Sequence, residues 1–185
     1  MDKKKIKLLL LGIVFVLIVI FAFNIVKINC EYRQAKNVSI PINTKEKVND
    51  SLAMTVIDAK LLNMEESTAE YGNDIVDEED DVEFKTICVE VEFENLSDKE
   101  IEGQIFDFSI ESNVYSNGIS PEMYGAVNNG QNMYLTLGAK EKKKVYLTYV
   151  LYCNQFGVQK WNKLDLKDFY IVKDRYPVKT KWKVK

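Results

Sequence analysis

The sequence predicts an all-β domain, an antiparallel β-sandwich or barrel of about seven or eight strands, preceded by one transmembrane helix. Three observations support this fold class. An unbroken apolar run lies near the N-terminus, apolar and polar residues alternate in short stretches over most of the remaining chain, and Gly- and Asn-containing turn signals separate those stretches. Alternation with a period of two is typical of strands that bury one face.

The first element is the apolar run. No polar side chain interrupts Leu8 to Phe23, and Val26 extends the run to 19 residues with Asn24 near its end. A helix of that length spans roughly 28 Å, close to the hydrocarbon thickness of a bilayer. Four lysines precede the run and Lys27 follows it, which favours a cytoplasmic N-terminus. We therefore expect a cytoplasmic stub at residues 1–7 and a transmembrane helix at residues 8–26.

Three fates of this segment are compatible with its length, and an uncleaved signal anchor is favoured. A cleaved signal peptide needs small residues before the cut, and only Ala22 is small in this region. A lipoprotein needs small residues before its acceptor cysteine, but Lys27, Ile28 and Asn29 precede Cys30. A buried soluble helix is excluded, because the run is apolar on every side. The expected location is the cell membrane, single-pass, with the C-terminal domain extracytoplasmic.

The remaining chain is organised as a tether and one domain. Residues 27–50 are mixed polar and are expected to form a tether, with one short strand at Val38–Ile42. Residues 51–185 are expected to form the extracytoplasmic β-sandwich, and only Asn162–Tyr170 has the pattern of a turn or two of helix. The alternation predicts strands at Leu52–Leu62, Lys85–Phe93, Ile101–Ile110, Met133–Leu137, Val145–Tyr152, Phe169–Val172 and Val178–Val184.

Four segments together resemble a known group of domains: "FKTICVEVEFEN", the polar "LSDKEI", "FDFSIES" and "LTLGAKEKKKVYLTYVL". This pattern resembles the bacterial membrane-tethered or lipid-anchored immunoglobulin-like domains of unknown function, and is similar to a small secreted mycobacterial antigen. The likeness covers roughly residues 52–172. It implies an extracytoplasmic, non-catalytic, immunoglobulin-like β-sandwich, and it supplies no functional residues. The chain differs from the lipid-anchored members, because it has no acceptable lipidation site.

Composition limits the chemistry of the chain. The sequence contains no histidine, so neither a Ser-His-Asp nor a Cys-His site can form within it. Dinucleotide, phosphate-loop and nucleophile-elbow patterns are missing, and no cofactor is expected. A nucleic-acid partner is not expected, because the basic segment is short and an acidic segment precedes it. We expect no enzyme; a divergent hydrolase with paired carboxylates stays open as a lesser alternative.

The acidic run at Asp74–Asp81 is the densest charge cluster of the chain. Asp77, Glu79 and Asp81 could offer oxygen ligands to Ca²⁺, although the spacing does not fit an EF-hand. Clustered carboxylates also repel one another, so a solvated loop is the simpler interpretation. No metal is therefore expected, with these three residues as weak candidates.

Three cysteines lie at positions 30, 88 and 153. A disulfide between Cys88 and Cys153 is conceivable in an oxidising compartment. The alternation, however, places Cys88 on the outer face with Glu90 and Glu92, opposite the apolar residues. Unpaired thiols are therefore favoured, with an intermolecular bridge at Cys30 as an alternative.

Two segments are candidates for contact with a partner. The loop Ser116–Tyr134 contains Met123, Tyr124 and Tyr134, and loops on a sandwich often carry binding residues. These side chains could instead cover the end of the core. The final "KTKWKVK" could contact anionic polymers or lipid headgroups, but an edge strand protected by lysines is favoured.

These observations predict a non-enzymatic binding or accessory module of a bacterial envelope, with a protein partner and a single-pass membrane anchor. The Lys-, Asn- and Ile-rich composition suggests a Gram-positive source. The alternative is a membrane-anchored immunity or inhibitor protein that neutralises an extracytoplasmic toxin or enzyme. Residues 64–111 contain eighteen acidic and two basic residues, which would attract a basic partner.

Overall fold

The structure is a computed structural model that describes residues 3–32, 34–72, 82–113 and 115–184. It divides into two compact units, Met1–Ala35 and Lys36–Lys185. The first unit consists of helix α1 (Lys3–Glu31). Every described side chain of α1 is exposed, and the helix is long and apolar enough to cross a membrane. The predicted span at residues 8–26 lies within α1, which begins earlier and ends later.

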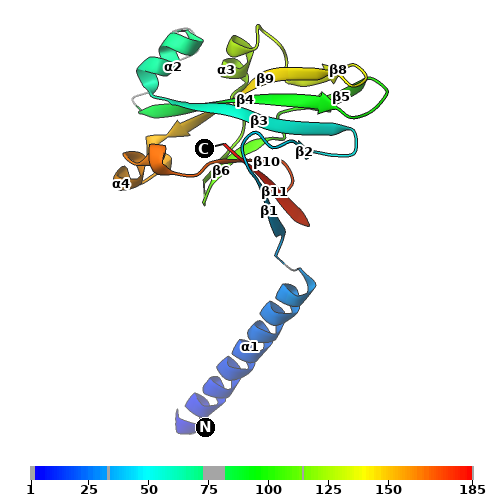
Figure 1. The fold of residues 1–185 in the computed structure, drawn as a ribbon. Coiled ribbons are helices and arrows are strands. Elements are labelled where there is room, and N and C mark those ends of the chain that lie inside the picture. The colour runs from blue at the N-terminus through cyan, green and yellow to red at the C-terminus, as the bar shows by residue number, and fades with distance from the viewer. Residues whose placement is uncertain (1–2, 33, 73–81, 114, 185) are drawn as a thin grey trace. The chain divides into compact units, whose positions relative to one another are not determined.

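The second unit is a β-sandwich (Figure 1). One layer is a five-stranded sheet in the order β1-β11-β10-β6-β7, and the other is a four-stranded sheet in the order β2-β3-β4-β9. A third, two-stranded sheet pairs β5 with β8. The strands are β1 (Lys36–Ile40), β2 (Glu46–Lys47), β3 (Leu52–Leu62), β4 (Phe84–Asn95), β5 (Ile101–Gln104), β6 (Ser109–Ser112), β7 (Tyr115–Asn117), β8 (Tyr134–Leu137), β9 (Lys142–Tyr152), β10 (Tyr170–Val172) and β11 (Val178–Lys183).

Short helices complete the second unit. Helix α2 (Met64–Tyr71) begins at a capping box in which the Asn63 side chain accepts from the Glu66 backbone and the Glu66 side chain accepts from the Asn63 backbone. Helix α3 (Pro121–Val127) begins after Ser120, with proline at its first position. Figure 1 shows α2 and α3 on the outer side of the β3–β4–β9 layer. The remaining helical segments are α4 (Val158–Trp161), η1 (Cys153–Gln155) and η2 (Leu164–Leu166).

The main core lies between the layers, as the alternation predicted. Alternate residues of β4 and β9 point inward, and the five-stranded layer faces them with residues such as Ile171 and Trp182. Burial of these apolar side chains is the main stabilising contribution to the fold, at about 25 cal/mol per Å² of apolar surface. The inward residues of the two long central strands are Ile87, Val89, Val91, Phe93, Val145, Leu147, Tyr149 and Leu151.

The inward-pointing residues of strand β3 change from even-numbered to odd-numbered positions at a β-bulge. Val56 pairs with Val91, but the next pair is Asp58 with Glu90, so Ile57 is an extra residue on the β3 side. Before the bulge Met54 and Val56 point inward, and after it Ala59 and Leu61 contact the core. The bulge therefore explains why the alternation in this segment is irregular in the sequence.

The strand pattern departs from the sequence prediction in four respects. The described residues contain eleven strands rather than seven or eight, partly because a turn splits 101–110 into β5 and β6. Residues 36–50 were predicted as tether with one short strand at Val38–Ile42; that strand corresponds to β1, but β2 follows it and both belong to the second unit. The sandwich is not wholly antiparallel, because β1 pairs with β11 in parallel. Finally, β11 lies between β1 and β10, so the lysine-rich final strand is not an edge.

Asn95 connects two turns at one end of the sandwich. Its side chain is fully buried. Its amide nitrogen donates to the carbonyl oxygens of Lys99 at 2.6 Å, Leu137 at 3.2 Å and Gly138 at 2.8 Å. Its carbonyl oxygen accepts from the backbone N–H and the hydroxyl of Ser97, both at 2.8 Å. One side chain thus joins the β4–β5 turn to the β8–β9 turn.

We predict that Asn95→Asp destabilises residues 36–185 by about 3 kcal/mol, because a carboxylate cannot donate to the carbonyl groups of Lys99, Leu137 and Gly138. Urea unfolding followed by circular dichroism measures the change. The matched control is Asn154→Asp, at an exposed position, for which we expect a change below about 0.5 kcal/mol. Equal stabilities of the two variants would show that Asn95 does not hold these turns.

Candidate binding surfaces

The predicted calcium ligands Asp77, Glu79 and Asp81 lie outside the residues that the structure describes. Within the described ranges, no group of three or more acidic or cysteine side chains is arranged to hold a metal ion. The sequence-based metal candidates therefore stay a prediction.

Met123 and Tyr124 do not form a contact surface. Both lie on the buried side of α3, with 6% and 2% of their surface exposed. Met123 packs with Tyr71, Phe84 and Val150 in a second apolar cluster, and Tyr124 belongs to the main core. The expectation of partner contact is wrong for these two residues, because α3 uses them to cover the sheet.

Tyr134 does lie on the surface. It is 57% exposed and contacts Phe106, which is 44% exposed, with ring centroids 6.1 Å apart in an edge-to-face arrangement. Tyr134 is opposite Gln104 in the β5–β8 pair. The exposed aromatic pair therefore lies at one end of the β5–β8 sheet, with Tyr134 in β8 and Phe106 just after β5.

The three cysteines are unpaired in the structure. Cys88 is opposite Thr148 of β9, and Cys153 lies five residues further along the chain, roughly 16 Å away in extended backbone. A disulfide needs α-carbons about 4.4–6.8 Å apart, so this strand register excludes the candidate bridge. Cys30 is exposed.

Cys88 points to the outer face of β4, as predicted, but it is buried, and Tyr71 and Glu70 of helix α2 lie beside it. A small cleft of about 130 Å³ reaches the thiol, lined by Asp58, Ala59, Lys60, Glu70, Cys88, Glu90 and Tyr146. Next to it, the hydroxyls of Ser67 and Thr86 form a buried hydrogen bond of 2.8 Å. Burial raises the pKa of the Cys88 thiol, which disfavours the reactive thiolate at neutral pH.

We predict that Cys30 reacts first with a thiol reagent in the detergent-solubilised chain, and that Cys88 reacts last. Reaction at Cys88 should accelerate as the pH rises above the ordinary range of a thiol, because its raised pKa keeps the thiolate population low below that range. Mass spectrometry of peptides after timed labelling measures the order. Rapid labelling of Cys88 at pH 7 would contradict its burial beside α2.

Beyond α2 and α3, the outer face of the four-stranded sheet carries a ladder of ion pairs. Lys144 pairs with Glu90 at 2.7 Å, and Lys142 pairs with Glu92 at 3.0 Å and Glu94 at 3.4 Å. A hydrogen bond from Lys45 contributes most to lowering the pKa of Glu94. The lysines are largely exposed, so these pairs stabilise the fold only weakly. The stability that Glu94 contributes is present at neutral pH and is lost as the pH falls through its lowered pKa.

The long edge strand β9 is closed by hydrogen bonds from β7 and from the segment between β7 and β8. Asn128 donates its side-chain amide to the Tyr146 carbonyl at 2.9 Å and accepts from the Tyr146 N–H at 2.9 Å. Ser120 donates its backbone N–H to the Thr148 carbonyl, and Tyr115 donates its hydroxyl to the Val150 carbonyl. Together these bonds replace a neighbouring strand over half of β9, which reduces the tendency of the edge to pair with another chain.

A groove of about 350 Å³ lies between β5 and the turn that precedes β3. Its apolar lining includes Leu52, Leu135 and Leu137, and its two charged lining residues are Asp50 and Glu102. The complete lining is Asn49, Asp50, Ser51, Leu52, Ile101, Glu102, Gly103, Leu135 and Leu137. Nothing in the alternation of the sequence indicated this groove, because it depends on the separation of two sheets.

A second cleft, of about 270 Å³, lies beside β6, β7 and α4. The Tyr115 and Phe156 rings stack in its wall with centroids 4.7 Å apart, and Lys160 and Lys167 supply positive charge. Burial raises the pKa of the Tyr115 hydroxyl to about 12, so this group stays protonated at neutral pH and donates to the Val150 carbonyl.

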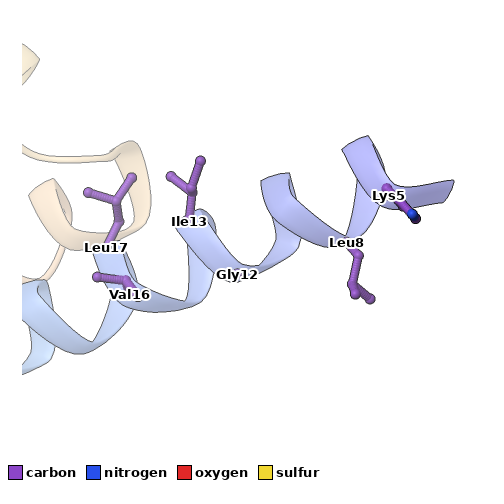
Figure 2. Close-up of a pocket in the computed structure, with 6 residues that line it drawn as sticks. All are labelled: Lys5, Leu8, Gly12, Ile13, Val16 and Leu17. Atoms are coloured by element: carbon purple, nitrogen blue, oxygen red, sulfur yellow. The ribbon is translucent and has the colours of Figure 1, made fainter. Parts of the chain in front are cut away.

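A shallow hollow lies on α1 by itself. Figure 2 shows it around Gly12, which carries no side chain between the turns of Leu8 and Val16. No atom lies within 4 Å of the position that a Cβ at Gly12 would occupy. The hollow is the gap left by one missing side chain in an otherwise apolar helical surface.

Comparison with known proteins gives a family match. A family model described as "Domain of unknown function (DUF5028)" matches residues 29–180. No curated protein sequence matches the chain.

Three solved structures are similar to this chain at low sequence identity. The yjhA protein of Bacillus subtilis is 13% identical, with coverage of 79% of this chain and 99% of its own and a TM-score of 0.47. An uncharacterised β-sandwich protein of Clostridium difficile 630 is 12% identical, with coverages of 83% and 98% and a TM-score of 0.46. A candidate lipoprotein of Bacillus subtilis, ycdA, is 15% identical, with coverages of 77% and 38% and a TM-score of 0.44. At such identities these structures transfer no functional residues to this chain.

Proposed function

The chain belongs to the DUF5028 family of domains of unknown function, and from this premise we propose that it is a membrane-anchored, extracytoplasmic, non-enzymatic module that binds a protein partner. In this proposal α1 is an uncleaved signal anchor, and the β-sandwich is an immunoglobulin-like domain held at the outer face of a bacterial membrane. The Gram-positive source suggested by composition is part of the same proposal.

The observation that carries the proposal is the exposed apolar surface of α1. Nothing in the structure covers its described side chains, and exposing so much apolar surface to water is costly. A bilayer removes that cost, because a helix of this length satisfies its own backbone inside lipid. The one polar residue within the run, Asn24, donates its side-chain amide to the Ile20 carbonyl at 3.0 Å, which reduces the cost of burying it in lipid.

The second unit supports a binding role rather than catalysis. The groove beside β5 and the cleft beside α4 lie on a rigid sandwich with its own core. Such scaffolds often present binding residues. Cys88 is a protonated thiol beside a helix, and the printed sequence contains no histidine that could activate it. The groove and the cleft are therefore better explained by a partner-binding surface than by a catalytic site.

Topology can be tested by labelling Cys30 in intact cells. In a chain carrying Cys88→Ala and Cys153→Ser, we predict that a membrane-impermeant maleimide modifies Cys30 before lysis, because Cys30 follows the apolar run. The matched control adds Cys30→Ser and Lys5→Cys, which moves the only thiol to the other end of α1, and its labelling should require lysis. Labelling of residue 5 in intact cells would show that the chain has the opposite topology. Release of the shortened chain into the medium would show that the N-terminal segment is a cleaved signal peptide.

A second candidate function is an immunity or inhibitor protein, favoured by the excess of acidic over basic residues in 64–111. Such a protein would attract a basic toxin or enzyme through long-range electrostatics. Its association rate should then fall steeply between low and physiological ionic strength. A partner whose association rate is insensitive to salt would exclude this candidate but leave the general binding role intact.

A further inference from the structure

Among the described residues, strand β5 has a neighbouring strand on one side alone, and its other edge is free. It pairs with β8 through Ile101 opposite Leu137 and Gly103 opposite Leu135, and the Ile105 N–H continues the ladder with a 3.1 Å bond to the Met133 carbonyl. In an antiparallel ladder hydrogen-bonded pairs alternate with non-bonded pairs. Glu102 and Gln104 therefore direct their backbone N–H and C=O groups away from β8. Among the described residues, neither makes a backbone hydrogen bond to another element.

The groove described above lies along this free edge, and Gly103 keeps it open. Ile101 and Ile105, the residues two positions before and after Gly103, face the core, so a side chain at 103 would point the same way. No atom lies within 4 Å of the position of a Cβ at Gly103. A glycine inside a strand often marks a place where another chain or ligand approaches closely.

The lining of the groove is suited to an apolar side chain of a partner, and the acidic residues at its rim are suited to a positively charged one. Leu52, Leu135 and Leu137 are buried residues that line the space. The charged residues among the lining, Asp50 and Glu102, are both acidic. On β5, Glu102 is exposed on the face opposite to the core, where it would lie beside the outward side chain of an added strand.

We propose that β5 is the docking edge for an extended, basic segment of a partner protein. The segment adds as a strand beside β5, bonds to the backbone of Glu102 and Gln104, and inserts one apolar side chain into the groove. Its lysine or arginine residues face outward next to Glu102. This recognition mode uses backbone bonds for affinity and alternate side chains for specificity. The inference names the partner of the proposed binding module and so rests on that function.

The contrast with β9 supports this choice of edge. Side chains of Asn128 and Tyr115 satisfy the outward backbone groups of β9 at Tyr146 and Val150. The free edge of β5 has no such cover from the described residues, and it has an apolar groove next to it. Protein edges that are left open beside an apolar space are suited to strand addition.

The test measures binding of a fluorescent peptide to the full chain in a non-ionic detergent. The probe is Lys-Val-Lys-Val-Lys-Val-Lys, which in extended form presents valine to the groove and lysine to Glu102. Two control peptides replace lysine with glutamate or carry N-methyl groups on the lysine residues, which removes the backbone donors. Fluorescence anisotropy should show saturable binding of the lysine peptide and much weaker binding of both controls.

Protein variants test the groove itself. Gly103→Val should weaken binding by about tenfold, because its side chain occupies the space of one apolar side chain of the peptide. Gly103→Ala should weaken peptide binding by a smaller factor. It provides a second measurement in case Gly103→Val does not fold. The matched control is Gly118→Val, since Gly118 also has no atom within 4 Å of its Cβ position and does not line the groove; its affinity should equal that of the unchanged chain.

Three results would overturn the docking edge: no saturable binding of the lysine peptide, equal binding of the N-methylated peptide, or equal affinity of Gly103→Val and Gly118→Val in folded protein. Equal binding of the glutamate peptide would refute the basic character of the partner segment. Because binding is measured on purified chain, these results are independent of membrane topology. Failure of the anchoring proposal appears only in the labelling of Cys30 in cells.

Discussion

The hydrogen bonds of Asn95 are the constraint on which the rest of the sandwich depends. This buried amide bonds to the carbonyl groups of Lys99, Leu137 and Gly138 and fixes the exit of β4, the entry to β5 and the turn between β8 and β9. Those turns set where the β5–β8 sheet lies relative to the long strands. A buried polar hub of this kind favours one arrangement, because any other leaves several groups unpaired in a low dielectric.

The position of β5 leads directly to the groove. The turn held by Asn95 places β5 beside the segment before β3, and Gly103 leaves the space between them unfilled. The same domain closes another of its edge strands, β9, with the side chain of Asn128. The edge of β9 is thus covered by the fold itself, while that of β5 presents backbone groups, an apolar space and acidic side chains together.

The alternation in the sequence correctly identified the core face of β4, because a period of two depends only on local backbone geometry. Residues whose neighbours come from distant segments were predicted less well. Met123 and Tyr124 resembled loop contacts but are buried against the sheet. Cys88 was placed on the correct face, yet it is buried beside α2. Tyr134 is the one of these loop residues that the fold leaves exposed.

The sequence by itself determined the apolar N-terminal helix, the β-rich composition of the domain and the inward residues of its long strands, because each depends on residues close together in the chain. Only the tertiary structure decided that β1 pairs with β11 in parallel, that the final strand is internal, and that Cys88 and Cys153 lie far apart. The groove beside β5 belongs to this second group. It exists because residues near 50, 102 and 136 meet, and no local pattern encodes which segments meet in a sandwich.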